Sequence, residues 1–129
     1  MALHTQMTKG GSENLSDEAQ YKEAVQAMEG GDESAKTKVA FFKLSGRGGA
    51  GVDAERAIVL LEERTKEGDC EAKWMLGLCY EFGILMEQDV DRAEVLYQES
   101  YEGGNVVGKF LKENVEGERG SGMMNVNSL

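Results

Sequence analysis

The glycine-rich stretch in the middle of the chain is the one motif that could bind a cofactor. Gly46-Arg-Gly48-Gly-Ala-Gly51 has the spacing G-x-G-x-x-G, follows an apolar stretch and precedes an apolar segment that starts at Asp53. In dinucleotide-binding proteins such a loop joins a strand to a helix, so that backbone N–H groups approach a pyrophosphate. That fold needs several more strands, and no other part of the chain has a convincing strand pattern. We therefore interpret residues 46–51 as a flexible inter-helix loop, with nucleotide binding as an alternative.

Other residues that could carry chemistry are few and poorly placed. The carboxylate pairs Glu62-Glu63 and Asp89/Asp91 are typical of the solvated face of an acidic helix, and the second pair lacks the glycine and distal glutamate of a calcium loop. The single histidine, His4, lies in a segment without apolar periodicity, so no serine or cysteine has an ordered base beside it. We expect no catalytic, cofactor-binding or metal-binding residue, and therefore no enzyme activity.

Cysteine usage indicates the compartment. Cys70 and Cys79 are the only cysteines, and they lie at the start of a predicted helix and two turns into it. At about 1.5 Å per residue they should be about 10 Å or more apart, which is beyond the reach of a disulfide. Two free thiols suit a reducing compartment, so we expect a cytoplasmic protein.

Length and charge exclude further classes of function. The chain has 129 residues, of which 40% are hydrophobic and 29% charged, which is enough to build one small core. A formal net charge of −10 repels phosphate groups, so nucleic acids and anionic membranes are poor partners. The apolar run at 57–61 is too short to span a bilayer, and the N-terminus has no secretory pattern.

Comparing the chain with itself reveals an internal repeat. Small or apolar residues between Ala72 and Gly83 are spaced as one helical stripe, and the same stripe stands 37 positions upstream, from Ala35 to Gly46. A second element recurs as well, because residues 53–57 (DAERA) match residues 89–93 (DVDRA). Such a unit is a helix, a loop and a second helix, which predicts helices near 34–45, 53–67, 70–82 and 89–102.

Specific residues should position these helices. Asp53 and Asp89 stand where a side chain can cap the second helix of each unit. Gly77 should mark the place where a second helix crosses closely, because it lies in the middle of the helix predicted at 70–82.

The repeat is similar to a known family. The pattern Ala-x3-Leu-Gly-x2-Tyr-x2-Gly at 72–83, followed by Asp89 and Ala93, resembles the Sel1-like repeat, a unit of about 36 residues related to the tetratricopeptide repeat. The copy at 35–71 is degenerate, since Ala40 replaces the glycine and Lys43 the tyrosine. The resemblance implies an all-α fold, a short right-handed α/α solenoid of about two repeats.

The resemblance also implies how the chain is organised. The repeat domain covers 16–116, with repeats at about 35–71 and 72–107 and flanking helices at 16–30 and 105–116. Residues 1–15 and 117–129 are rich in Gly, Ser, Asn and Thr, so we expect flexible tails there.

The family's usual role implies a non-catalytic adaptor or scaffold that binds another protein. The first helix of each unit lines the concave surface of such scaffolds. Beside the shared stripe, helix 70–82 carries a second apolar face that the upstream copy lacks, apart from one phenylalanine. We predict that the partner-binding residues are those of this face and that phenylalanine: Trp74, Met75, Leu78, Phe82 and Phe41.

Two alternatives remain for this face. It could pack beneath the helix at 105–116 or the apolar loop at 84–86, or it could join two copies of the chain in a homodimer. Nearby acidic residues would favour a neutral or basic protein or peptide as the partner, and they are Glu81, Glu87, Asp89 and Asp91.

Overall fold

The computed structural model describes residues 15–128, with side chains as far as residue 118. Within these residues the chain forms helices and no strand, as predicted. The helices are α2 (Asp17–Glu29), α3 (Ala35–Ser45), α4 (Ala54–Lys66), α5 (Cys70–Phe82), α6 (Val90–Glu102) and α7 (Val106–Ser128), with a 3-10 turn, η2 (Arg47–Gly49), after α3.

The second helix of each unit starts at the predicted cap. Asp53 and Asp89 each accept a hydrogen bond from the backbone N–H three residues further on, at 3.1 and 3.0 Å. The first helix of each unit ends at a glycine in the left-handed conformation, Gly46 with φ 75° and Gly83 with φ 66°. Glycine adopts this conformation without the steric cost of a side chain, so it is favoured at helix ends.

The two units also close their loops in the same way. The backbone N–H of Asp53 donates to the carbonyl of Lys43, and the N–H of Asp89 donates to the carbonyl of Tyr80, both at 2.8 Å. Lys43 and Tyr80 are equivalent positions in the two copies, 37 residues apart. The repeat in the sequence is therefore a repeat in the backbone.

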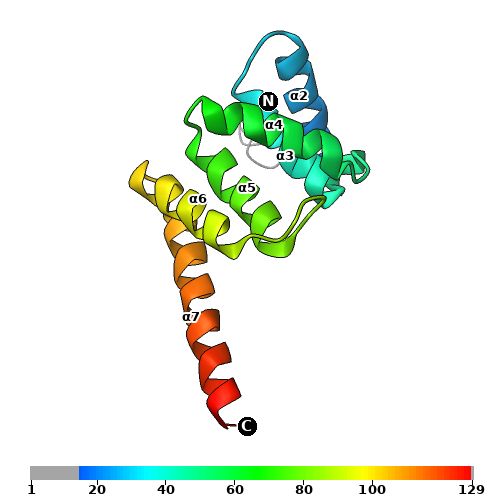
Figure 1. The fold of residues 1–129 in the computed structure, drawn as a ribbon. Helices are drawn as coiled ribbons and strands as arrows, with labels where there is room; N and C mark the ends of the chain where they lie inside the picture. Colours follow the sequence, from blue (N-terminus) through cyan, green and yellow to red (C-terminus); the bar gives the residue numbers. More distant parts are fainter. Residues whose placement is uncertain (1–14, 129) are drawn as a thin grey trace, which may run out of the picture.

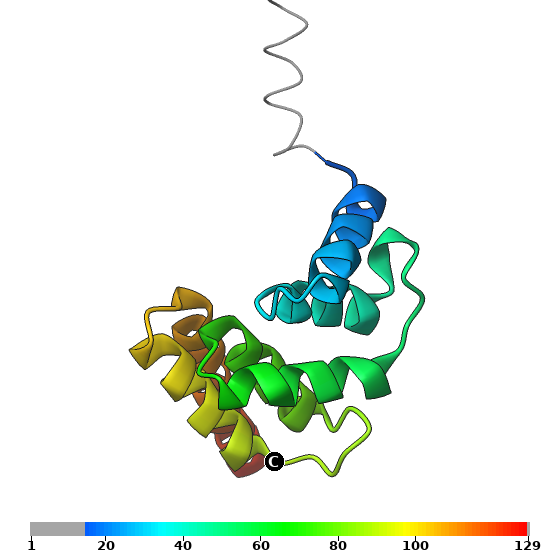
Figure 2. The ribbon, with the colours of Figure 1, turned by 90° about the horizontal axis from the view of Figure 1, so that it is seen from above.

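Each helix packs against the next one along the chain, and first helices of neighbouring units also touch, α3 with α5 and α5 with α7. The helices follow one another in a curved row when viewed from above (Figure 2). Helices α3 and α4 form one unit and α5 and α6 the next. By the same register, α2 is the second helix of a preceding unit and α7 the first helix of a following one. This is the arrangement of an α/α solenoid.

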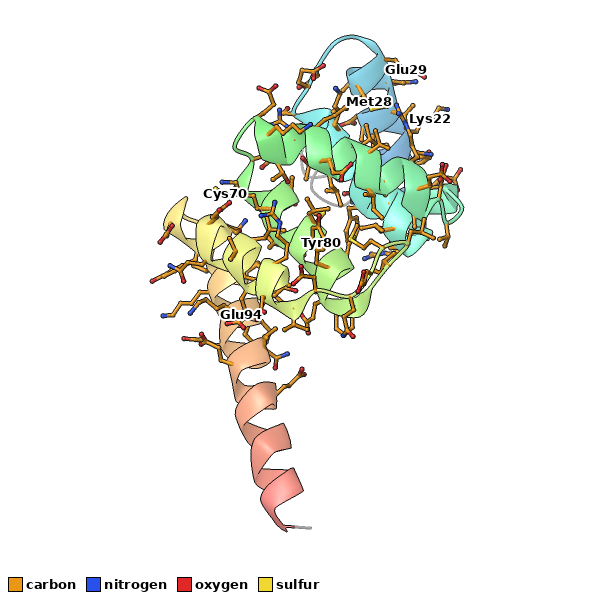
Figure 3. All side chains as sticks on the ribbon, in the orientation of Figure 1. Lys22, Met28, Glu29, Cys70, Tyr80 and Glu94 are labelled. Carbon is orange, nitrogen blue, oxygen red and sulfur yellow. The ribbon has the colours of Figure 1, made fainter. Side chains whose placement is uncertain are left out.

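The repeated apolar positions form the core. Val39 and Leu76 are equivalent and both buried, as are Ala57 and Ala93. One cluster of buried side chains extends from α2 to α6, and a second joins α6 to α7 through Tyr97 and other residues. Tyr80, labelled in Figure 3, packs against both clusters.

Gly77 lies where α6 crosses α5, which confirms the prediction. A Cβ atom at Gly77 would lie 2.5 Å from the ring of Tyr97. Carbon atoms that are not bonded to each other need about 3.5 Å or more, so only glycine fits beneath this ring without a shift.

The last helix is longer than predicted. The sequence predicts a tail at 117–129, whereas α7 continues to Ser128 and extends away from the other helices (Figure 1). The chain contains no proline, and glycine costs a helix only about 1 kcal/mol relative to alanine. Glycine-rich composition alone therefore does not end the helix. The tail predicted at 1–15 lies, apart from Leu15, outside the described residues, and so does His4.

Candidate functional site

The five residues predicted to bind a partner surround one apolar groove. They belong to α3 and α5, the first helices of the two units, and the groove between them has a volume of about 370 Å³. The loop after α3, the start of α4 and the loop after α5 complete the wall. The lining residues are Phe41, Leu44, Ser45, Val52, Ala54, Trp74, Met75, Leu78, Cys79, Phe82 and Ile84.

The predicted residues differ in how far they are buried. Phe82 is 65% exposed at the edge of the groove, whereas Met75 is 3% exposed and belongs to the core. Phe41, Trp74 and Leu78 are half-buried, so each combines a core contact with an open side. The face is therefore part core and part groove, since its residues range from the buried Met75 to the exposed Phe82.

Trp74 connects the two clusters of buried side chains. Its side chain packs against both core clusters and also lines the groove. The indole N–H is buried and donates to no acceptor among the described residues. A buried donor without a partner costs about 1–3 kcal/mol, which the apolar contacts of the indole ring must offset. Trp74 supports the groove as much as it forms its surface.

A second hollow of about 360 Å³ adjoins the apolar groove, since Phe41, Trp74 and Met75 line both. Apart from Phe42, its other lining residues are polar, and they include an ion pair between Arg47 and Asp17, with Nε and Oδ2 2.7 Å apart. The guanidinium of Arg47 also lies over the ring of Phe41, 5.7 Å from its centre. The surface formed by α3 and α5 is therefore apolar at the groove and charged at the adjoining hollow, where Arg47 and Asp17 lie.

The groove includes residues that sequence reasoning missed. Val52 is 71% exposed on the loop before α4, and Leu44 comes from the end of α3. Ile84 belongs to the apolar loop at 84–86, which the sequence offers as an alternative contact of this face. Loop residues such as Val52 carry no helical periodicity, so no pattern in the sequence marked them. Leu44 carried a signal, because it lies one turn after Phe41 on the same helix.

The glycine loop has the wrong context for a nucleotide site. The apolar stretch before it belongs to helix α3 and not to a strand. Gly48 instead lies against α2, where a Cβ atom would be 2.6 Å from the carbonyl oxygen of Asp17. Its backbone has φ 67°, which an L residue rarely adopts. Close packing of the loop on α2 accounts for this glycine.

Glu81 is not the surface charge that the sequence predicted. It is 6% exposed, and its Oε1 accepts a hydrogen bond from the hydroxyl of Tyr97 at 2.6 Å. Burial, together with this hydrogen bond to a carboxylate, raises the pKa of Tyr97 above its usual range. The carboxylate is thus held inside the second unit, where it cannot meet a partner.

Both cysteines are free thiols, as predicted. Cys70, labelled in Figure 3, packs at the start of α5 against Gly103, just after the end of α6. Cys79 is fully buried, and burial raises the pKa of its thiol to about 11. A thiol with that pKa stays protonated at neutral pH and is a poor nucleophile.

The described part of the chain contains neither a metal-binding cluster nor a membrane-spanning helix. Between residues 15 and 128, no three His, Cys, Asp or Glu side chains are grouped so that they could hold a metal ion. Within the same range, no helix combines the length and the apolar character needed to cross a membrane.

The fold defines the chain as an α/α solenoid with an apolar groove on the surface formed by its first helices. Comparison with solved structures identifies the particular solenoid. A protective antigen present in uropathogenic Escherichia coli strains, which displays an SLR (Sel1-like repeat) fold, matches with a TM-score of 0.68 and 23% identity over 85% of this chain. A Sel1 repeat protein from Oxalobacter formigenes matches with a TM-score of 0.57 and 16% identity over 70% of this chain. The chain has the Sel1-like repeat fold.

The two matched structures are longer than this chain. It spans 24% of the length of the first and 42% of the second. No protein-family model and no curated protein sequence matches the chain.

Proposed function

We propose that the chain is a non-catalytic adaptor that binds a segment of another protein in the groove between α3 and α5. One observation carries this proposal: apolar side chains from two repeat units surround a groove of about 370 Å³ and leave Phe82 65% exposed. Apolar surface gains about 25 cal/mol for each Å² removed from water, so a groove of this kind favours an apolar occupant. The Sel1-like repeat fold supports the same role.

The residues that line the groove and the adjoining charged hollow suggest what the segment contains. Apolar side chains would occupy the groove beside Phe82, and polar side chains would lie at the charged hollow near Arg47 and Asp17. Amphipathic segments that dock in grooves have this division. The net charge of −10 favours the approach of a neutral or basic segment over an acidic one.

The test is affinity capture with two matched variants of the full chain. Phe82→Ser removes an exposed apolar side chain from the groove, and Val95→Ser removes a 47% exposed apolar side chain from α6, outside the groove. A partner of the groove should be retained by wild type and by Val95→Ser and lost with Phe82→Ser. Its isolated binding segment should bind Phe82→Ser about 30-fold more weakly, the loss expected for a contact worth about 2 kcal/mol. Equal binding to both variants would contradict the proposal.

A second candidate function is self-association through α7. Val106 is 72% exposed and Phe110 67% exposed, and the two lie one turn apart on this helix. Apolar side chains that share one exposed face can join two copies of a chain. Light scattering over a range of concentrations should then give a dimer mass that Phe110→Ser lowers to that of a monomer. A monomer mass at every concentration would exclude this candidate.

A further inference from the structure

The chain enters α2 beside the charged hollow that contains Arg47 and Asp17. Asp17, the first residue of α2, lines the charged hollow, and so does Gln20 one turn later. The side chain amide of Gln20 donates a hydrogen bond to the carbonyl of Leu15 at 2.7 Å, which fixes the backbone at this point. The segment at 1–14 is therefore joined to the rest of the protein beside the charged hollow, which shares Phe41, Trp74 and Met75 with the groove.

We propose that residues 1–14 bind in the groove between α3 and α5 of the same chain and compete there with the partner. This inference rests on the proposed function, because it assigns a regulator to the same groove. Three further properties of the segment support it: its reach, its apolar residues and its charge.

The reach of the segment is sufficient. Fourteen residues can span up to roughly 45–50 Å when extended. Helix α5, which forms one side of the groove, has 13 residues and is therefore about 20 Å long. The segment can pass from Asp17 to Phe82 without being fully extended.

The composition of the segment fits an apolar groove. Met1, Leu3 and Met7 supply apolar side chains, and methionine adapts its shape to irregular cavities. Residues 10–12 are Gly-Gly-Ser, a composition that allows a chain to turn back on itself. The groove in turn holds exposed apolar side chains, Phe82 among them, that no described residue covers.

The charge of the segment is also compatible. Its two charged side chains, Lys9 and Glu13, cancel, so the formal net charge of −10 belongs to the rest of the chain. A neutral segment approaches an acidic protein without net repulsion, whereas an acidic tail would be repelled.

The tether sets how strongly the segment must bind. A short flexible linker gives an effective concentration on the order of 1 mM. A segment whose free peptide binds with a Kd of about 0.1 mM would then cover the groove about nine-tenths of the time and weaken the partner about tenfold. A Kd above about 1 mM would leave the groove mostly open.

The experiment uses the full chain and its only tryptophan, Trp74, which lines both hollows. The variant Leu3→Ser/Met7→Ser keeps the length and charge of the segment and removes two of its apolar side chains. Acrylamide should quench the fluorescence of Trp74 at least twofold more strongly in this variant than in wild type. Added peptide 1–14 should bind the variant with a Kd of 1 mM or tighter and restore the lower quenching.

The peptide titration carries its own control. Binding of the added peptide should be lost when Phe82→Ser is introduced as well and kept when Val95→Ser is introduced instead. Unchanged quenching in Leu3→Ser/Met7→Ser, a Kd weaker than 1 mM, or peptide binding that does not respond to Phe82→Ser would each overturn the inference. A partner that needs Phe82 but binds wild type and Leu3→Ser/Met7→Ser equally would refute the inference and leave the proposed function standing.

Discussion

At the scale of single residues, three positions join α5 to α6 in the second unit. Gly77 makes room for the ring of Tyr97, and the hydroxyl of that ring donates a hydrogen bond to Glu81. The ring thus fills the space that a side chain at Gly77 would take and also satisfies a buried carboxylate. The equivalent positions of the first unit are apolar, namely Ala40, Leu61 and Leu44.

Replacing Gly77 should destabilise the protein although glycine is a poor helix former. A Cβ atom at this position would lie 2.5 Å from the ring of Tyr97, so we expect Gly77→Ala to lower the free energy of unfolding by about 1–3 kcal/mol through overpacking. The matched control is Gly117→Ala in α7, where a Cβ atom meets nothing within 4 Å. It should be neutral or raise stability by up to about 1 kcal/mol. Urea titrations measure both, and an equal response of the two variants would contradict this packing.

The hydrogen bond inside the second unit predicts a second effect. Tyr97→Phe removes the donor to Glu81 and leaves the buried carboxylate without this partner, so we expect a loss of about 1–3 kcal/mol. Tyr97→Phe combined with Glu81→Leu should recover much of that loss, because both polar partners are then absent, as in the first unit. Additive losses in the double variant, measured by urea denaturation, would show that the pair is not coupled.

The buried thiol predicts how stability depends on alkaline pH. Burial raises the pKa of Cys79 from its ordinary value near 9.0 to about 11, so the folded protein holds this proton more tightly than the unfolded chain. The resulting stability is complete below pH 9 and is lost as the pH rises from 9 to 11, by roughly 2–3 kcal/mol. Urea titrations in a reducing buffer at pH 8.5 and 10.5 measure the loss. It should be smaller in Cys79→Ala, and an identical pH dependence in the two proteins would contradict the prediction.

At the scale of elements, helix α5 serves both the core and the groove. Met75 is 3% exposed and packs in the core, whereas Phe82, two turns later, is 65% exposed at the edge of the groove. Trp74 lies between these extremes, since it contacts both core clusters and lines the groove. Substitutions along this one helix should therefore affect stability and binding to different degrees.

Three alanine variants measure this division. Met75→Ala should lower the free energy of unfolding by about 2–5 kcal/mol and affect binding only through folding. Phe82→Ala should change stability by less than about 0.5 kcal/mol and weaken the partner by about 2 kcal/mol. Trp74→Ala should do both, with a stability loss of about 3–5 kcal/mol. Thermal melts and titrations with the partner segment on each variant provide the check. If Phe82→Ala lowers stability as much as Met75→Ala does, the exposed position of Phe82 is wrong.

The helices themselves could be predicted from the sequence because the repeat fixes their register. Asp53 and Asp89 mark the helix starts, and Gly46 and Gly83 mark the ends, since caps depend on local backbone geometry. The end of α7 could not be predicted in this way. Its glycines resemble stop signals, yet nothing in the chain, such as a proline, blocks the helix before Ser128.

At the scale of the whole molecule, the groove could be predicted in part. Comparison of the two copies identifies α5 residues that the repeat fold does not require, and these residues do line one groove with Phe41. The same comparison could have indicated the buried hydrogen bond between Tyr97 and Glu81, because both residues replace leucines of the first unit. Which of these residues are buried depends on how α3 and α5 approach each other, and a one-dimensional pattern does not contain that angle.

The most direct test of the central claim is to map the partner segment on the folded chain by NMR. The claim is that the segment binds on the surface shared by α3 and α5. Adding the segment to labelled protein should shift the signals of Phe41, Leu78 and Phe82 and leave the exposed Val59 and Val95, which lie outside the groove, unchanged. Shifts confined to Val59, Val95 or α7, with the groove signals unchanged, would contradict the account.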